Sequence, residues 1–436
     1  MDARMRLQRG SDSSATPGGG AAALRIMVAG LRGIPHVQGG VETHAAELYA
    51  RLANLGAEIT VICRERHRPK DIGQRWAGIR LRWFWSPGGR GIEAAVHTML
   101  AVLYAGIRRP HIMHIHAVGP SIAVPLAKML GLRVVVTHHG QDYLREKWRG
   151  PEKTLIHLGE RFAVRFSDAL ISISSSVQAA LRAQYGRDST WIPNGVSAEP
   201  PPASNALLDR YHLTRHRYVV QVSRLVPEKR QHDLIRAFRA AQLPGWKLVL
   251  VGGAPVADPY AASVHELAAG DDSIVCTGTL AAPEAHELLA GAGMFVLPSS
   301  HEGLPIALLE AIAYGVPSLA SDIPGNREIG LDADSYFAVG DTEAVASRLR
   351  TLAASPAARA AAVQGYAQIL GRFDWDQIAQ STMEVMQATA RAPWRFRFPA
   401  TPEKAEAVRE RVPGVADRAI PKPVAVRSSS RRANVT

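Results

Sequence analysis

The chain has 436 residues, more than a single hydrophobic core usually holds, so its length predicts two domains. With 47% hydrophobic and 21% charged residues, the composition is typical of globular proteins and excludes the low-complexity and membrane-embedded classes. The cysteines, Cys63 and Cys276, are too few for a disulfide framework or a cysteine zinc site and fit a reducing compartment. The longest apolar stretch, residues 94–107, is shorter than the roughly 20 residues of a membrane span. We therefore expect a cytoplasmic protein.

The net charge of +12 is concentrated in two segments. Residues 391–436 contain 11 Lys and Arg against 4 Asp and Glu and lack periodicity, so we predict a disordered basic tail over residues 393–436. Residues 64–109 contain 10 Lys and Arg against 3 Asp and Glu, interleaved with Trp76, Trp83, Phe84 and Trp85. This mixture suits nucleic acid or an anionic membrane surface, and it equally suits a solvated basic face over core aromatics. Of the two ligands we favour the inner-membrane surface, and we expect no nucleic acid partner.

Short apolar runs alternate with helical patterns along the chain, which predicts parallel α/β layers. Residues 1–23 lack the apolar core of a signal peptide and are predicted to be a disordered tail. Residues 24–30 form the first predicted strand, and a Gly/Pro loop then leads into a helix whose apolar face includes Val41 and Leu48. Further strands are predicted at residues 58–63, 79–84, 111–116, 133–137, 169–173 and 190–192.

A Pro-rich stretch interrupts this alternation, and we predict an interdomain linker over residues 197–217. A second series of strands follows at residues 218–222, 246–251, 273–276, 294–297, 317–320 and 336–338. We therefore predict an α/β protein with two Rossmann-like, doubly wound domains that face each other across a cleft. Ligands of such folds lie beyond the carboxyl ends of the strands. We expect the site between an acceptor domain at residues 24–196 and a donor domain at residues 218–372.

The strongest chemical signal is the segment 299–310, Ser-Ser-His-Glu-Gly-Leu-Pro-Ile-Ala-Leu-Leu-Glu. Glu302 follows a predicted strand, and Glu310 lies in a predicted helix that starts near Pro305 and Ile306. A helix start offers backbone N–H groups and a positive dipole end to a diphosphate, while the two carboxylates can accept hydrogen bonds from sugar and ribose hydroxyls. Taken alone, the segment also fits a helix with one solvated and one capping glutamate.

Two cations follow the first strand of the second series. Arg224 and Lys229 lie in the sequence Val-Ser-Arg-Leu-Val-Pro-Glu-Lys, at the sheet edge where the segment 299–310 is expected. A departing nucleoside diphosphate needs its charge neutralised, and an arginine fork with a lysine point charge can replace a metal ion in that role. The alternative is a pair of ordinary surface cations, with Glu228 beside Lys229.

The loop at residues 30–43 brings Gly39 and Gly40 to a helix start. Glycines there let the backbone approach a phosphate or sugar closely. The loop lacks the G-x-G-x-x-G pattern, which argues against a hydride-transfer enzyme. A tight turn from strand to helix would also explain the glycines.

Histidines gather at the ends of two predicted strands. His114 and His116 share one strand face, and His138 and His139 follow the next strand. A metal site of several histidines is conceivable, but no carboxylate with ligand spacing completes it, so we prefer hydrogen-bonding roles and predict no metal ligand. We expect His139 near the reacting centre with His116 as its neighbour; a satisfied core or loop histidine is the alternative for each.

Two D-x-D triplets, at residues 332–334 and 374–376, could be the metal ligands of a metal-dependent transferase. Both follow the proposed donor helix, whereas a metal-binding pair should end a central strand of the nucleotide domain. We interpret all four as loop and helix-cap aspartates.

In combination, these segments resemble family 4 of the retaining GT-B glycosyltransferases over residues 24–386. The family's elements occur in order at Gly39-Gly40-Val41-Glu42, at Thr137-His138-His139-Gly140, at residues 223–229, and at Glu302 and Glu310 followed by residues 311–315. The resemblance implies the GT-B architecture and a final helix, residues 373–392, that crosses back to the first domain.

The resemblance also implies roles for individual residues. Arg224 and Lys229 would bind the diphosphate, Glu310 the ribose and Glu302 the donor sugar. Gly40 would lie near the transferred phosphate and His139 near the anomeric centre. The chain departs from the family where His138 and His139 are adjacent, so either could face the sugar, and where Leu304 and Pro305 replace an aromatic residue and a glycine.

The expected activity is metal-independent, retaining transfer of a hexose-type sugar from a UDP-, GDP- or dTDP-linked donor, with no cofactor required. The acceptor is expected to be a glycan or lipid-linked glycan, in the assembly of a bacterial exopolysaccharide, capsule or lipopolysaccharide. A GT-B sugar-nucleotide epimerase would share the phosphate ligands but needs acidic and basic groups around C2 of the sugar. A non-catalytic nucleotide-sugar binder is the third interpretation.

Overall fold

A computed structural model describes residues 23–88, 92–141, 150–197, 205–254 and 258–394. The predicted tails therefore lie almost wholly outside the described residues. By its contacts the chain divides into a unit that ends at Phe396 and a second unit, Arg397–Thr436, which lies outside the described residues.

The first sheet has eight strands in the order β3-β4-β2-β1-β5-β6-β7-β8, and every pair except β3 and β4 is parallel. The strands are β1 (Arg25–Ala29), β2 (Glu58–Arg64), β3 (Arg75–Trp76), β4 (Ile79–Phe84), β5 (Ile112–His116), β6 (Val134–His138), β7 (Ala169–Ser172) and β8 (Thr190–Trp191). All seven strands predicted for this part are confirmed. The two-residue edge strand β3 was not predicted, because periodicity cannot identify so short a strand.

The second sheet has six parallel strands in the order β11-β10-β9-β12-β13-β14. They are β9 (Tyr218–Val222), β10 (Lys247–Val251), β11 (Ile274–Gly278), β12 (Met294–Leu297), β13 (Ser318–Ser321) and β14 (Tyr336–Phe337). All six predicted strands are confirmed, and two parallel sheets confirm the predicted fold class. We call the first sheet with its helices the first lobe, and the second sheet with its helices the second lobe.

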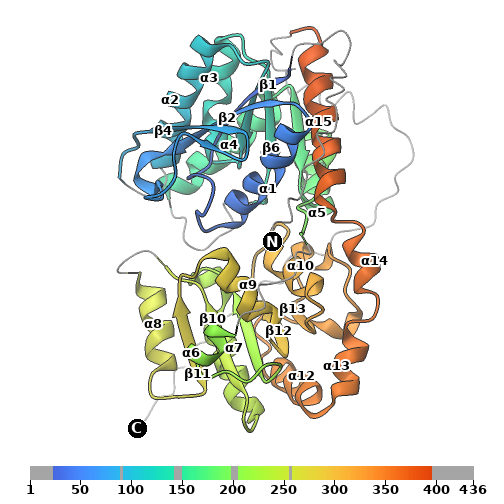
Figure 1. Cartoon of the computed structure of the whole chain (residues 1–436). Helices are drawn as coiled ribbons and strands as arrows, with labels where there is room; N and C mark the ends of the chain where they lie inside the picture. Colours follow the sequence, from blue (N-terminus) through green and yellow to red (C-terminus); the bar gives the residue numbers. More distant parts are fainter. Residues whose placement is uncertain (1–22, 89–91, 142–149, 198–204, 255–257, 395–436) are drawn as a thin grey trace, which may run out of the picture. The chain divides into compact units, whose positions relative to one another are not determined.

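Helices cover both faces of the first sheet (Figure 1). On one face, α1 (Gly40–Asn54) packs with β-strand residues such as Ile26 and Val61. On the other face lie α2 (Ile92–Arg108), α3 (Val124–Met129), α4 (Pro151–Phe166) and α5 (Ser175–Tyr185). Because strands buried on both faces need apolar residues at every position, their sequences lack alternation and read as continuous apolar runs.

The second sheet is also covered on both faces. One core includes side chains of α7 (Gln231–Ala241), α8 (Pro259–Ala268) and α12 (Thr342–Ala354). The other includes side chains of α6 (Ala206–Arg210), α9 (Ala282–Ala290), α10 (Ile306–Ala313) and α14 (Tyr366–Leu370). The short helices α11 (Pro324–Arg327) and α13 (Pro356–Ala362) complete the lobe.

The last described helix, α15 (Trp375–Arg391), packs on the first lobe. Trp375, Ile378 and Met383 belong to the same core as α1 and β1. A Cβ on Gly195 would come within 2.6 Å of the Trp375 ring, so only glycine permits this approach. The Val196 N–H donates to the Phe373 carbonyl at 2.9 Å, which joins the two crossings between the lobes.

The predicted linker at residues 197–217 is partly a structured element of the second lobe. Helix α6 lies within it, and Leu207, Leu208 and Leu213 are buried in a core with Tyr218. The linker prediction rests on the prolines at residues 200–202. Apolar residues with helical spacing begin only a few positions later and belong to the second lobe.

Among the residues that the structure describes, no helix combines the length and apolarity needed to cross a bilayer.

Candidate active site

A chain of buried polar side chains lies at the carboxyl ends of β5 and β6. His114 Nε2 hydrogen-bonds Thr137 Oγ1 at 2.8 Å, and His114 Nδ1 hydrogen-bonds the Tyr49 hydroxyl at 2.6 Å. The Tyr49 hydroxyl also bonds His116 Nε2, and His116 Nδ1 bonds His139 Nε2 at 2.9 Å. This chain fixes the ring of His139 from behind, so His139 is held in place at the end of the strand.

The structure separates the two adjacent histidines of the motif. His138 Nε2 pairs with Glu160 Oε1 at 2.9 Å, and the Tyr185 hydroxyl donates to Glu160 Oε2 at 2.7 Å. Burial raises the pKa of Glu160, but the hydrogen bonds from His138 and Tyr185 outweigh it, so the net pKa is lowered. His138 is thus committed to a buried pair, while the His139 ring faces His116.

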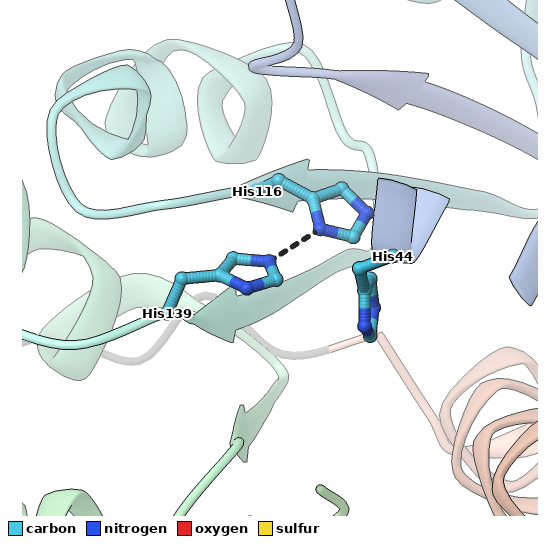
Figure 2. A group of neighbouring side chains, drawn as sticks. All are labelled: His44, His116 and His139. Carbon is cyan, nitrogen blue, oxygen red and sulfur yellow. Dashed lines mark hydrogen bonds between the residues drawn. The ribbon is translucent and has the colours of Figure 1, made fainter. Parts of the chain in front are cut away.

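His44 is a member of this group that the sequence analysis missed (Figure 2). It lies on α1, its ring makes an edge contact with the His139 ring at 4.9 Å between centroids, and it is 2% exposed. Its Nδ1 bonds Asn194 Oδ1 at 2.9 Å, and Asn194 Nδ2 donates to the Leu304 carbonyl at 2.8 Å. A polar residue on the apolar face of a predicted helix was the signal that could have found it.

Three members of the histidine group, His44, His114 and His116, have pKa values below their ordinary value. Burial lowers the pKa of His44 to about 4, although the hydrogen bond with Asn194 acts to raise it. Burial, with a small contribution from His44, lowers the pKa of His114 to about 3, and the pKa of His116 is also well below its ordinary value. The first lobe therefore presents neutral imidazoles at this edge.

The glycine loop before α1 is braced by an ion pair that the sequence analysis missed. Arg32 Nε and Glu42 Oε1 are 2.9 Å apart, and Arg32 also donates to the Gln38 carbonyl. A Cβ on Gly39, whose φ is +150°, would come within 2.3 Å of both the Arg32 and Glu42 side chains. A Cβ on Gly40 would meet nothing within 4 Å, so the helix start at Gly40 faces open space.

The predicted cations of the second lobe lie on a loop with buried supports. Lys229 ends a short 3-10 helix and forms an ion pair with Glu302, both side chains being less than one fifth exposed. Gln231 Nε2 donates to the Arg224 carbonyl at 2.9 Å, and Gln221 Nε2 donates to the Lys229 carbonyl at 2.9 Å. Gln221 and Gln231 are both 1% exposed, so two buried amides fix the backbone that carries Arg224 and Lys229.

Glu302 and His139 are brought together by a backbone contact. A Cβ on Gly303 would lie 2.3 Å from the His139 carbonyl oxygen and 3.1 Å from Ile173 Cδ1. A Cβ on Gly140 would lie 3.2 Å from Gly303 Cα. The absence of side chains at Gly140 and Gly303 therefore lets the Glu302 loop pass directly beside His139, a requirement that the sequence analysis did not identify.

Glu310 lies on α10, as predicted, where Leu308, Leu309 and Ile312 are buried. Pro305 is the residue before the helix rather than part of its first turn, and Ile306 is the first helical residue. No side chain caps this helix start, so its first N–H groups point away from the helix without a capping partner. Glu310 Oε1 lies 3.3 Å from His286 Nε2.

The four D-x-D aspartates lie at the starts of helices, Asp332 and Asp334 at a 3-10 helix and Asp374 and Asp376 at α15. Asp374 caps α15 by accepting from the Gln377 N–H at 2.9 Å, and Asp376 pairs with Arg51 at 2.9 Å. Asp332 precedes a 3-10 helix, and the exposed Asp334 pairs with Arg348 at 2.8 Å. The carboxylates of Asp334, Asp374 and Asp376 thus bind groups of the protein itself.

A surface hollow of about 270 Å³ lies elsewhere in the second lobe. Its lining includes Asp332, Tyr366 and Arg372 but none of the predicted site residues. Because Arg224, Lys229, Glu302 and Glu310 do not line this hollow, the candidate site lies instead around Lys229, Glu302 and His139.

Two protein-family models match two successive parts of the chain. The family model described as Glycosyltransferase Family 4 matches residues 38–200, and that described as Glycosyl transferases group 1 matches residues 211–368. An alpha-maltose-1-phosphate synthase of Mycolicibacterium smegmatis is 30% identical over 387 residues, covering 80% of this chain and 96% of the relative. A GDP-mannose-dependent alpha-(1-6)-phosphatidylinositol monomannoside mannosyltransferase of Mycobacterium tuberculosis is 29% identical over 294 residues, covering 61% and 73%.

Solved structures share the fold. The sucrose-phosphate synthase of Thermosynechococcus elongatus has a TM-score of 0.72 at 20% identity and covers 84% of this chain and 98% of its own. Anabaena HepE in complex with UDP-glucose has a TM-score of 0.66 at 20% identity and covers 84% and 99%. From the two family models, the near full-length relative and the two parallel sheets, the chain belongs to the family 4 glycosyltransferases of the GT-B fold.

Proposed function

We propose that the protein transfers a hexose-type sugar from a nucleotide diphosphate sugar to a glycan or lipid-linked glycan, with retention and without a required metal. The observation that carries this proposal is the Lys229–Glu302 ion pair beside the His139 backbone. It joins a cation for a leaving diphosphate, a carboxylate for sugar hydroxyls and an imidazole within one small region. The donor domain is assigned to the second lobe and the acceptor domain to the first.

The proposed mechanism depends on electrostatic stabilisation of the departing diphosphate. Arg224, Lys229 and the uncapped start of α10 would neutralise the developing negative charge, which is the largest single need of such a reaction. The acceptor hydroxyl would attack on the face from which the diphosphate leaves, with a leaving oxygen as the base. Glu302 would orient the donor sugar and Glu310 the ribose. No protein side chain needs to become a covalent nucleophile.

The acid-base properties of the histidine group favour transfer over epimerisation. An epimerase needs an acid and a base with pKa values near the working pH around C2 of the sugar. The pKa values of His44, His114 and His116 lie far below neutrality. These residues are therefore unsuited to proton removal from carbon at neutral pH. A non-catalytic binder would not need the full set of Arg224, Lys229, Glu302 and Glu310.

The relatives support a sugar donor activated by a nucleotide. One relative is named as GDP-mannose-dependent, and others are named as an alpha-maltose-1-phosphate synthase and a glycogen synthase. We therefore include GDP-, UDP- and dTDP-linked hexoses as candidate donors, and we place the reaction in bacterial exopolysaccharide, capsule or lipopolysaccharide assembly.

The deciding experiment is a thermal-shift and turnover panel of UDP-, GDP- and dTDP-sugars, with and without chelator. We expect one donor class to raise the Tm of the wild type, because a ligand that binds the folded state stabilises it. This Tm shift should persist in the presence of chelator. The shift should disappear in Arg224→Ala and in Glu310→Ala. Arg236→Ala is the matched control, because Arg236 is an exposed cation on the neighbouring helix α7.

Product analysis separates the alternatives. Free nucleoside diphosphate with a lengthened acceptor supports transfer, and NMR of the new linkage reports whether the anomeric configuration is kept. An isomerised nucleotide sugar would replace the proposal with epimerisation. Donor binding that acceptor extracts never convert to product would favour the binder, and a strict requirement for a divalent metal would overturn the metal-independent mechanism.

We further propose that helix α2 docks the enzyme on an anionic inner-membrane surface. One side of α2 packs on the sheet through Thr98, Ala101 and Ala105. The opposite side exposes an apolar stripe at helical spacing, which with the preceding tryptophan comprises Trp85, Ile92, Met99, Leu103 and Ile107. Ile107 is 80% exposed and Trp85 is 67% exposed, and exposed apolar residues in such a row mark interaction sites.

Basic residues flank this stripe, which favours lipid over a neutral protein partner. Arg108 and Arg109 are exposed at the end of α2, next to an apolar row that could enter the headgroup region. By contrast, Trp83 and Phe84 are half-buried, so part of the aromatic content is core, as the alternative interpretation held. Sedimentation with phosphatidylglycerol vesicles tests this. We expect the double variant with Leu103→Asp and Ile107→Asp to lose vesicle binding and to keep its turnover on a water-soluble acceptor. Vesicle binding equal to that of the wild type would contradict the docking proposal.

A further inference from the structure

Three buried imidazoles converge beside the proposed reacting centre. One ring nitrogen from each of His44, His116 and His139 lies within 4.8 Å of the other two, and the residues come from α1, β5 and the end of β6 (Figure 2). All three are buried, and His139 is the most exposed at 7%. The proposed reaction assigns a role to His139 but leaves His44 and His116 without a direct one.

The protonation of His44 is set by its neighbour Asn194. Asn194 Nδ2 donates to the Leu304 carbonyl, which orients Oδ1 as the acceptor toward His44. His44 must therefore carry its hydrogen on Nδ1 and a lone pair on Nε2. That Nε2 is buried and has no hydrogen-bond partner among the residues that the structure describes. An unpartnered buried lone pair costs free energy, and such a group in a native site calls for a function.

His116 offers a second lone pair through the hydrogen-bond chain behind it. If His116 Nε2 donates to Tyr49, then Tyr49 donates to His114 and His114 donates to the Thr137 hydroxyl, so every member of the chain is satisfied. His116 Nδ1 then carries the lone pair and faces His139 Nε2 at 2.9 Å. A metal-ligating histidine is held by such a bond at its other nitrogen.

The geometry is close to that of a three-histidine metal site. Zn²⁺ accepts three neutral imidazoles at about 2.0 Å and leaves a fourth position open, which places ligand nitrogens about 3.3 Å apart. The His116–His139 pair would open slightly from 2.9 Å, and His44 would close from within 4.8 Å.

We propose that His44, His116 and His139 bind one divalent transition-metal ion of the zinc class, and that this ion inhibits the enzyme. The ion site follows from the side chains alone. The inhibition rests on the proposed function, because an ion held by His139 withdraws that imidazole from the donor sugar and adds positive charge where the anomeric centre develops its own. The all-nitrogen ligand set favours Zn²⁺, Cu²⁺ or Ni²⁺ over Mg²⁺, which prefers oxygen.

The binding test uses the full chain, dialysed against chelator and titrated with Zn²⁺ alone in a calorimeter. We expect one Zn²⁺ per chain, and we expect His44→Gln and His116→Gln each to weaken binding by more than about 100-fold, beyond the effect of losing a supporting partner. His265→Gln is the control, because His265 is exposed on α8 in the other lobe. Binding that His44→Gln and His116→Gln leave unchanged would overturn the site.

Two further readouts keep the test decisive. If a variant does not fold, electron paramagnetic resonance of the wild type loaded with one Cu²⁺ should show hyperfine coupling to three imidazole nitrogens, and a spectrum with one or none would overturn the site. In turnover assays with the donor found above, stoichiometric Zn²⁺ should lower the rate at least about tenfold, and chelator should restore it. Zn²⁺ binding without inhibition would overturn the switch. An absence of any transfer activity would instead count against the proposed function, since the calorimetry does not depend on it.

Discussion

The two lobes present opposite chemistry at the carboxyl ends of their strands. The first lobe has buried histidines whose pKa values are lowered far enough to keep them neutral, with His44 as an example. The second has half-buried ions, in which Lys229 pairs with Glu302. A neutral edge does not compete for the diphosphate, whereas a charged edge attracts it. We therefore expect the second lobe to bind the donor phosphates and the first lobe to contact the uncharged part of the donor.

Removal of a cation from the second lobe should have the largest effect. Lys229→Ala and Arg224→Ala should each lower kcat by about 10²- to 10³-fold, the usual cost of one group that stabilises transition-state charge. Steady-state kinetics at saturating donor measure this. The same change at exposed Arg236 should leave kcat within twofold of the wild type. A loss confined to the KM for the donor would show that the cations serve binding rather than the reaction.

A side chain at the point where the lobes meet should have the next largest effect. Gly303→Ala would place a Cβ 2.3 Å from the His139 carbonyl, so the Glu302 loop must move away. We expect about a 10²-fold loss of kcat/KM with a modest fall in Tm, because small misplacements of reacting groups are costly. Gly73→Ala, where a Cβ meets nothing within 4 Å, is the control. Unchanged turnover in Gly303→Ala would separate His139 from the donor site.

The buried pair behind the histidine edge should affect stability rather than chemistry. Glu160→Gln should cost about 2 kcal/mol of unfolding free energy at pH 7, because it weakens hydrogen bonds to a charged group. The pKa of Glu160 is lowered on folding, so its contribution is complete above the ordinary value of 4.5 and is lost as the pH falls through the folded value. Urea unfolding should therefore show a difference at pH 7 that shrinks below pH 4.5; a constant difference would contradict this assignment.

An effect confined to acid conditions should be the pH dependence of stability caused by the neutral histidines. The folded pKa of His44 is about 4 against an ordinary value of 6.5, so the unfolded chain takes up the proton first as pH falls. Stability should fall by up to about 1.4 kcal/mol per pH unit for this residue between those values. The slope should be shallower in His44→Gln and unchanged in His265→Gln. Equal slopes in all three proteins would indicate that folding does not lower the pKa of His44.

The sequence predicted both sheets because parallel strands buried on two faces are continuous apolar runs, which are easy to recognise. It also identified the charged residues of the second lobe, since Arg224, Lys229, Glu302 and Glu310 follow strands or lie on one helix. It missed the contributions that depend on tertiary contact. His44 is held in the histidine group by its hydrogen bond to Asn194, and Gly303 is needed because its backbone lies close to His139. Neither contact produces a recognisable pattern in the sequence.

The linker was the least accurate prediction, for a related reason. A run of prolines marks where regular structure stops, but it does not show where packing resumes. Leu207 and Leu208 are buried in the second lobe although the preceding residues gave no strand or long helical pattern. A five-residue helix such as α6 is stabilised by its core contacts and not by its own propensity.

The glycine contacts around Glu302 have a consequence for how this enzyme can change through evolution. A Cβ on Gly325 would lie 2.4 Å from the Glu302 carbonyl, and Gly303 and Gly140 are similarly restricted. Every amino-acid replacement of a glycine adds a Cβ, so mutation at these codons leads away from a functional loop. New donor specificity is therefore more accessible through neighbours that already carry side chains, such as Leu304 and Pro305. A mutational library focused on those two positions should return many more active variants than one that randomises the glycines.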